Sequence, residues 1–304
     1  LRARREQVAL MGSIGRLLVN RGKNSEGERE LKAALSLAET LRNARIPGLP
    51  EWAGEVDYLS IRTALADLAA ERGEWEKLER LRRETAELAA QLRQRSGEDP
   101  AVLHLVGIAE KKYGAILSFR GKQAEAERHY RIALAIEEEA YRRNPGNRER
   151  IDLSLSLSEV GGAVWNQNRP QEARPYFERA LKLRQEALQA DPSDSWARWA
   201  LGSLLMRMSS FETSQKNYRR AEELLKQAEA VGGEPVVAAR VWGLQALLAK
   251  ETRQLDLAAA LARKALQRFR EVAAARELAA TDKATMERLA PLAASIGAAD
   301  PMNR

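Results

Sequence analysis

Repetition at a fixed offset constrains this chain more than any other feature of its sequence. Residues 130–147 read YRIALAIEEEAYRRNPGN and residues 177–194 read FERALKLRQEALQADPSD, with an aromatic residue, an Ala-Leu pair, a Glu-Ala pair and a proline at matching places. The offset is 47 residues, as Ala133 and Ala180 and Pro145 and Pro192 show within these stretches, and it also relates two earlier pairs: Gly114 and Gly161, and Ala126 and Ala173. Because repeats bury a core between neighbours rather than around one centre, we expect an array of repeats.

The order of residues within each copy indicates two antiparallel helices. A glycine is followed after twelve residues by alanine, after four more by an aromatic residue and after three more by a second alanine. The two series are Gly114, Ala126, Tyr130 and Ala133, and Gly161, Ala173, Phe177 and Ala180. Helices approach closely only where the side chains at their crossing are small. We therefore expect the glycine of a first helix to face the alanine of a second, with the aromatic side chain filling the gap between neighbouring copies.

Turn signals separate the expected helices. Residues 120–122 contain glycine, and residues 166–170 contain asparagine and proline, which favour turns. Pro145 and Pro192 each end a second helix, because the residue before proline is pushed out of the helical region. The richness of the chain in alanine, leucine, glutamate and arginine predicts an all-helical protein with no sheet.

The pattern resembles the tetratricopeptide repeat (TPR), a helical hairpin with a hydrophobic-Gly pair, the motif A-x3-F and a later proline. The residues that carry the resemblance are Tyr113-Gly114, Ala126, Tyr130 and Ala133, and Val160-Gly161, Ala173, Phe177 and Ala180. It implies an all-α fold, a right-handed superhelical solenoid of about six antiparallel helix pairs with a C-terminal capping helix. The standard repeat has about 34 residues, so the longer offset predicts unusually long helices, with roughly 20 Å added per hairpin.

Weaker copies extend the array towards both ends. Gly15, Gly22 and Gly27 belong to a first copy, whereas in the second copy Arg82 and Thr85 replace the expected aromatic residue and alanine. Later copies are marked by Ala221 and Ala228, and by Ala258 and Ala265. We expect one solenoid domain over residues 1–304, with units at 1–46, 51–98, 99–146, 147–193, 194–232 and 235–274 and a capping helix at 282–295.

Composition and motifs argue against catalysis. The chain has no cysteine and two histidines, His104 and His129, neither of which has metal-binding spacing around it. It has no Walker, protein-kinase or zinc-protease motif. The glutamates at 137–139 are interpreted as a solvated face. We therefore predict no enzyme activity, no catalytic or metal-binding residue and no cofactor.

Charge and hydropathy limit the classes of partner that we expect this chain to bind. The net charge is +7, but the basic side chains are interleaved with acidic ones and aromatic residues are few. Nucleic-acid binding is therefore not predicted. The most apolar run, residues 235–249, is interrupted by Arg240 and is too short to span a bilayer. We expect a protein or peptide partner and no membrane span in this chain.

The TPR resemblance also implies a binding groove, since the first helices of successive TPRs line a concave face. Carried onto this sequence, the inward positions and their neighbours include Lys111, Ser118, Ser158, Trp165, Asn166, Met206 and Arg207, together with Ser203 and Thr213. Groove residues of this kind hold an extended or helical peptide through hydrogen bonds and one aromatic surface. Trp165, Trp196, Trp199 and Trp242 are otherwise interpreted as packing residues, because each lies in an apolar helical pattern.

Some TPR proteins close a clamp of lysine, arginine and asparagine on the terminal carboxylate of a peptide. Lys111 matches one position of such a clamp, but Ser158, Glu159 and Gly162 follow where an asparagine is needed. The chain is therefore predicted to have no preference for a free terminal carboxylate.

The long units resemble the TPR regions behind the catalytic domain of many bacterial serine/threonine protein kinases. The resemblance implies a non-catalytic sensor or docking region of a larger bacterial signalling protein. The alternatives are a stand-alone TPR adaptor and a regulator whose solenoid changes pitch when a ligand binds. We expect a cytoplasmic location for a stand-alone module and an extracytoplasmic one for the tail of a membrane-anchored kinase.

Overall fold

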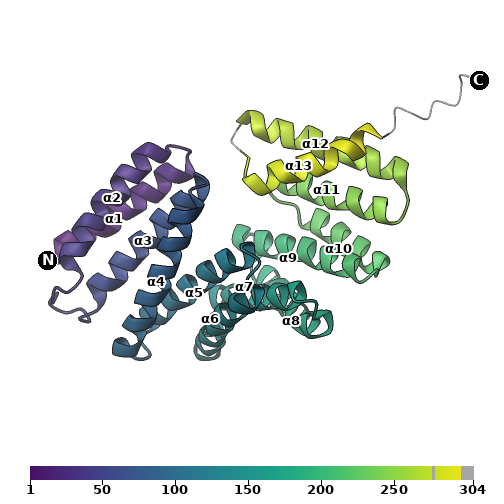
Figure 1. Cartoon of the computed structure of the whole chain (residues 1–304). Coiled ribbons are helices and arrows are strands. Elements are labelled where there is room, and N and C mark those ends of the chain that lie inside the picture. The colour runs from purple at the N-terminus through teal and green to yellow at the C-terminus, as the bar shows by residue number, and fades with distance from the viewer. Residues whose placement is uncertain (276–277, 296–304) are drawn as a thin grey trace, which may run out of the picture. The chain divides into compact units, whose positions relative to one another are not determined.

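The computed structural model describes residues 1–275 and 278–295, which form thirteen α-helices and no strand (Figure 1). The helices are α1 (Arg2–Asn20), α2 (Asn24–Leu41), α3 (Ala53–Glu71), α4 (Trp75–Ser96), α5 (Pro100–Phe119), α6 (Gln123–Arg143), α7 (Asn147–Asn166), α8 (Pro170–Ala190), α9 (Ser195–Ser214), α10 (Tyr218–Val231), α11 (Pro235–Glu251), α12 (Leu255–Ala275) and α13 (Ala280–Ala294). The predicted all-α helical-repeat solenoid is confirmed.

Each of the six hairpins from α1–α2 to α11–α12 turns in the same way. One residue of each turn has a left-handed backbone, with φ between 60° and 77°: Gly22, Gly73, Gly121, Asn168, Lys216 and Arg253. The amide that follows this residue donates a hydrogen bond to a carbonyl five residues earlier, at 2.8–3.3 Å in all six turns. This bond satisfies a carbonyl that the end of the first helix would otherwise leave unpaired.

The left-handed residue sets a common register for all six hairpins. Seven residues before it, the first helix carries a small buried residue: Gly15, Ala66, Gly114, Gly161, Ser209 and Ala246. Five residues after it, the second helix carries Gly27, Leu78, Ala126, Ala173, Ala221 and Ala258, all buried. Eleven of these twelve positions hold glycine, alanine or serine, and Leu78 is the exception. Small side chains at a crossing allow two helices to pack closely.

The second helix of each hairpin continues the same buried face. Nine residues after the turn residue stand Leu31, Arg82, Tyr130, Phe177, Leu225 and Ala262, and twelve after it stand Ala34, Thr85, Ala133, Ala180, Ala228 and Ala265. All twelve are buried. A Cβ added to Gly114 would lie 2.8 Å from Cε1 of Tyr130, so this glycine faces the ring of Tyr130.

The helices are long, as the repeat length predicts. The hairpin of α5 and α6 contains helices of 20 and 21 residues, so these two helices alone exceed the standard repeat of about 34 residues. The terminal helix α13 packs against α11 and α12. Its buried residue Leu289 would lie 3.1 Å from a Cβ added to Gly243 of α11. This helix occupies the place predicted for a capping helix.

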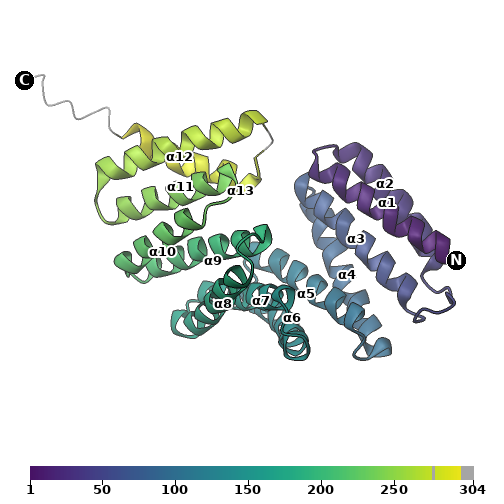
Figure 2. The same cartoon turned by 180° about the vertical axis from the view of Figure 1, so that it is seen from behind.

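Two compact units make up the chain. The first comprises Leu1–Glu149 with Glu159–Pro170, and the second comprises Arg150–Ser158 and the chain from Gln171 onward. Within the first unit, α1–α2, α3–α4 and α5–α6 follow one another as layers, and within the second unit so do α9–α10 and α11–α12 (Figures 1 and 2). Residues 276–277 and 296–304 of the expected single domain lie outside the described part.

Ion pairs join successive hairpins at a repeated position. In the first unit, the carboxylate six residues after a left-handed residue pairs with an arginine at the end of the next first helix: Glu28 with Arg72, Glu79 with Arg120 at 3.0 Å, and Glu127 with Arg169 at 2.9 Å. In the second unit the signs are exchanged, since Arg174 pairs with Glu212 at 2.5 Å. Each contact links one repeat to the next near the turns.

Candidate functional site

One face of α9 and one face of α11 are open to solvent-filled cavities within the second unit. The face of α9 carries Trp196, Trp199, Ser203, Met206, Ser210 and Thr213, and the face of α11 carries Val237, Arg240, Leu244, Leu247 and Glu251. Spacings of three and four residues place each set on one side of its helix. Two cavities lie along these faces, one at each end, and together they are called the α9–α11 groove.

The first cavity of the groove lies at the start of α9. Its volume is about 810 Å³, and α9, α11 and the loop of Gly232 and Gly233 line it. Trp196 and Trp199 stack with ring centroids 4.5 Å apart and an interplanar angle of 13°. Their exposed fractions are 48% and 44%. Two large aromatic rings thus stack on each other beside an open cavity.

The second cavity lies where α9 and α11 end, and its volume is about 710 Å³. Hydroxyl groups of α9 line it, and the Thr213 hydroxyl donates to the Ser209 carbonyl at 2.8 Å. Three cationic side chains, Lys216, Lys250 and Arg288, and one acidic side chain, Glu251, surround it. This end of the groove is therefore polar and predominantly basic, in contrast to the aromatic end.

A two-fold hydrogen bond fixes α13 beside the groove. Arg240 donates to Asp282 from Nε to Oδ1 at 2.6 Å and from Nη2 to Oδ2 at 2.8 Å. The hydrogen bonds from Arg240 to Asp282 outweigh burial and raise the pKa of Arg240. Asp282 is buried. The pair therefore supplies a structural link rather than a free charge, although Arg240 lines the aromatic end.

Beneath the groove floor lies a buried arginine on α8. Arg184 is 2% exposed, and its Nε donates to the Ser154 hydroxyl at 3.0 Å. Its Nη1 donates to the Ala200 carbonyl and, at 3.3 Å, to the Ser203 hydroxyl. The Ser203 hydroxyl in turn donates to the Ala200 carbonyl at 2.9 Å. Ser203 is therefore held in place from below and does not rotate freely in the groove.

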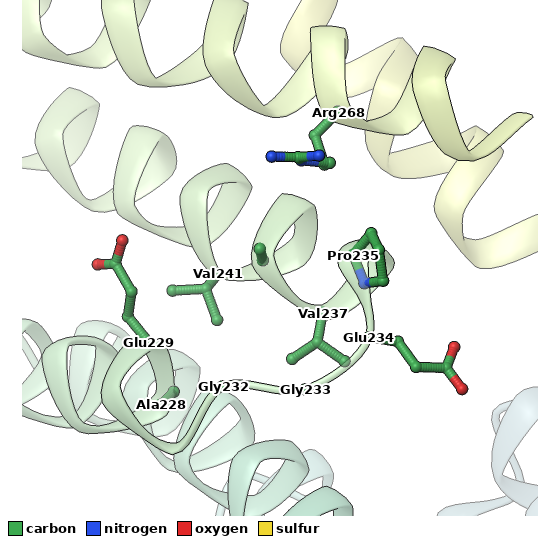
Figure 3. Close-up of a pocket in the computed structure, with 10 residues that line it drawn as sticks. Ala228, Glu229, Gly232, Gly233, Glu234, Pro235, Val237, Val241 and Arg268 are labelled. Carbon is green, nitrogen blue, oxygen red and sulfur yellow. The ribbon is translucent and has the colours of Figure 1, made fainter.

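A smaller cavity of about 210 Å³ lies at the same loop (Figure 3). Val237 and Val241 project from α11 near Gly232 and Gly233, and Arg268 reaches over from α12 (Figure 3). Arg268 pairs with Glu271 at 2.9 Å. Because its volume is about a quarter of the first cavity's and its arginine is already paired, this cavity is a weaker candidate for a ligand site.

The residues assigned to a groove in the first unit are engaged in contacts within the protein. Lys111 forms an ion pair with Glu137 of α6. The Ser118 hydroxyl donates to Gln123 at 3.0 Å, and Asn166 also reaches Gln123, at 3.5 Å. Trp165 is half-buried. The Glu137 carboxylate is buried, so the interpretation of this glutamate as part of a solvated face was wrong.

In the second unit, the predicted groove residues divide into two groups. Ser203 and Met206 line the first cavity and Thr213 lines the second. Arg207 instead donates from Nη1 to the carbonyl and the hydroxyl of Ser158, at 2.9 and 3.1 Å. Because Arg207 and Ser158 bind each other, they join α9 to α7 within this unit.

Two of the four tryptophans, Trp196 and Trp199, differ from their interpretation as packing residues. Trp196 and Trp199 are nearly half exposed, whereas Trp242 makes packing and polar contacts. Its Nε1 donates to Glu229 at 2.9 Å, and the Lys264 ammonium lies 3.8 Å from its ring centroid. A sequence signal for the exposed pair existed, because Trp199 and Trp196 lie four and seven residues before Ser203, on the predicted inward side of α9.

Each histidine makes a polar contact with another side chain of the protein. His129 Nδ1 lies 2.5 Å from Oε2 of the buried Glu110, and its ring packs edge-on against Tyr113. His104 is within 3.1 Å of Arg148. Across residues 1–275 and 278–295, no three histidine or carboxylate side chains are grouped as a metal site would need. Among the helices of this part of the chain, none has the length and apolar character that crossing a bilayer demands.

Comparison with known proteins agrees with the repeat register. The family model described as "Tetratricopeptide repeat" matches residues 154–194. The crystal structure of a Podosopora anserina putative kinesin light chain with nearly identical TPR-like repeats has a TM-score of 0.53 and 14% identity, covering 75% of this chain and 95% of that one. The chain has the tetratricopeptide-repeat fold.

Other solved structures share this fold at similarly low identity. BtubC (BKLC) from P. vanneervenii has a TM-score of 0.59 and 17% identity, covering 80% of this chain and 90% of that one. The apo form of the quorum sensor NprR from B. thuringiensis has a TM-score of 0.59 and 14% identity, covering 94% and 69%. No match was found among curated protein sequences.

Proposed function

We propose that this TPR protein is a non-catalytic module that binds an extended segment of a protein partner in the α9–α11 groove. The observation that carries the proposal is the stacked pair Trp196 and Trp199, 48% and 44% exposed on the wall of a cavity of about 810 Å³. Pockets that bury most of a ligand have volumes of about 300–1,000 Å³.

The two tryptophan rings leave apolar surface exposed to solvent. Each tryptophan offers a large apolar surface, and burial of such surface contributes about 25 cal/mol per Å². Tryptophan is also enriched among the few residues that dominate binding energy at protein interfaces. Because Trp196 and Trp199 are already stacked on each other, a ligand that covers them orders few further rotamers.

Selection of random displayed peptides on the immobilised protein tests the proposal. We expect the selected peptides to lose binding to the double variant Trp196→Ala/Trp199→Ala. The matched control is Trp75→Ala/Phe119→Ala, which removes another exposed stacked pair, with centroids 4.9 Å apart, from the first unit. Selected peptides that bind the groove variant and the wild type equally would contradict the proposal, provided that circular dichroism shows both variants folded.

The same groove would serve a larger signalling protein. We propose a bacterial serine/threonine kinase as the parent, and the support for this is the resemblance of the 47-residue units at 130–147 and 177–194 to kinase TPR regions. Sequencing of the gene upstream of the Leu1 codon tests it. Kinase glycine-rich, HRD and DFG motifs are the expected result, whereas a start codon close to Leu1 would make the protein a stand-alone adaptor.

A further inference from the structure

We infer that the α9–α11 groove selects peptides that carry a large apolar side chain and, about six residues away, a pair of acidic side chains. The inference rests on the proposed function and specifies its ligand. It follows from the different chemistry of the two ends of the groove, which share one face of α9 and one face of α11.

The aromatic end recognises the apolar side chain. Trp196 and Trp199 form one wall, and Met206, Val231 and Val237 add aliphatic surface. Two cations and one carboxylate, Arg198, Arg240 and Glu234, also line this end. Asp282 already neutralises Arg240, and Arg198 and Glu234 carry opposite charges. This end therefore has no excess of one charge to offset the hydration that a charged ligand side chain would lose, whereas an apolar side chain gains burial.

The basic end recognises the acidic side chains. Lys216, Lys250 and Arg288 are exposed and line the second cavity. Within the described ranges none of the three forms an ion pair, although exposed lysines elsewhere do, as Lys226 does with Glu222 at 2.7 Å. The three cations come from different parts of the fold, namely the α9–α10 turn, the last turn of α11, and α13.

Opposing charges at this end do not cancel the cations. Glu251 contributes one negative charge. The C-termini of α9 and α11 contribute the equivalent of about half a negative charge each. About one positive charge therefore remains in excess. A concave site of one sign raises the local concentration of ligands of the opposite sign and favours their association.

The length of α9 sets the spacing between the two ligand features. Fourteen residues separate Trp199 from Thr213, which line the first and second cavities. At a rise of 1.5 Å per residue this is roughly 21 Å along the helix. An extended peptide covers about 3.3–3.6 Å per residue, so about six residues bridge the two ends.

Four synthetic peptides test the inference, each acetylated and amidated so that no terminal charge contributes. The first carries phenylalanine, a spacer of about six glycine, serine and threonine residues, and two aspartates. The second replaces the aspartates by asparagines. The third halves the spacer, and the fourth replaces phenylalanine by serine. Fluorescence anisotropy of a dye on each peptide gives the dissociation constants.

We expect the aspartate peptide to bind about tenfold more tightly than the asparagine and short-spacer peptides, a difference of about 1.4 kcal/mol. The double variant Lys250→Gln/Arg288→Gln should bind the aspartate and asparagine peptides equally. Lys226→Gln is the matched control on α10, because it removes an exposed lysine outside the groove, and it should preserve the preference.

The outcomes separate this inference from the proposed function. If the phenylalanine peptides need Trp196 and Trp199 but show no preference for aspartate, the inference is wrong and the proposed function stands. If the aspartate preference survives loss of Lys250 and Arg288, the basic end is assigned wrongly. If no peptide, including those selected from a random library, depends on the tryptophans, both the inference and the proposed function are wrong.

Discussion

Arg174 of α8 donates two hydrogen bonds to Glu212 of α9, from Nη1 to Oε1 at 2.5 Å and from Nη2 to Oε2 at 3.0 Å. Glu212 is 2% exposed, and Asn217 donates to it as well, at 2.8 Å. Burial alone would raise the pKa of Glu212, but the hydrogen bonds from Arg174 and Asn217 outweigh it and lower the pKa. The pair therefore keeps the Glu212 carboxylate ionised and buried at the interface between two repeats.

Removal of the Arg174 side chain should destabilise the second unit. Arg174→Ala leaves the buried Glu212 carboxylate short of its charged partner, and hydrogen bonds to charged groups contribute about 1.5–3 kcal/mol. We expect the free energy of unfolding in urea to fall by about that amount. Arg219→Ala is the control, since Arg219 is fully exposed in its pair with Glu223 at 3.7 Å. Equal effects of the two substitutions would show that the buried pair is not special.

The turn residues offer a stabilising substitution. Arg253 holds a left-handed backbone with φ of 60°, which costs a residue with a side chain about 1–2 kcal/mol. Arg253→Gly should relieve this strain, less the entropy that glycine loses on folding, for a net gain of about 0.5–1 kcal/mol.

The converse substitution, of glycine by a residue with a side chain, is possible at the same turn position of the hairpin of α5 and α6. Gly121→Ala, at φ of 77°, should lower the free energy of unfolding by about 1 kcal/mol. Thermal unfolding of both variants checks the pair of predictions. A lower melting temperature for Arg253→Gly would contradict the shared turn geometry.

Acid should weaken the first unit through Glu28. The hydrogen bonds from Lys32 and Arg72 lower the pKa of Glu28 from 4.5 to about 2. Because the folded-state pKa is depressed, its contribution to stability is complete above pH 4.5 and is lost as the pH falls towards 2. The difference in unfolding free energy between wild type and Glu28→Gln should therefore shrink across this window.

Urea unfolding at several pH values measures that difference, with Glu6→Gln, an exposed residue of α1, as the control. If the difference in unfolding free energy between wild type and Glu28→Gln stays constant from pH 4.5 down to pH 2, the pKa of Glu28 is not lowered in the folded protein.

The contact between Gly114 and Tyr130 predicts a coupled pair of substitutions. A Cβ at position 114 would lie 2.8 Å from Cε1 of Tyr130, so Gly114→Ala should cost about 1–3 kcal/mol through overpacking. Tyr130→Leu removes the ring, so the double variant should lose less than the sum of the single variants. A double-mutant cycle from urea unfolding measures this coupling. Additive losses would mean that the two residues are not in contact.

The sequence predicted the central hairpins well because their markers are distinctive. Glycine at 114 and 161 and the alanines that follow are rare enough in this arrangement to reveal the register. The outer hairpins use Ala66 and Ala246 at the same position, which a chain rich in alanine conceals. Lys216 and Arg253 take the left-handed turn positions without any residue that favours such a turn.

The candidate site was predictable only in part. The register placed Ser203 and Met206 on the inward face of α9, where they line the cavity. It could not show that Lys111 meets Glu137 or that Arg207 meets Ser158, because these partners are remote in sequence. Trp196 and Trp199 lie in a helix that is apolar on several sides, and sequence periodicity alone does not distinguish a packed side from an open one.

Cross-linking of a bound peptide shows whether the peptide lies in the α9–α11 groove. A peptide from the random selection would carry a photoreactive phenylalanine analogue, and mass spectrometry would locate the cross-linked residues after illumination. We predict attachment within α9 and α11, at Ser195–Ser214 and Pro235–Glu251. Attachment confined to the outer helices α10 and α12, or to the first unit, would contradict it.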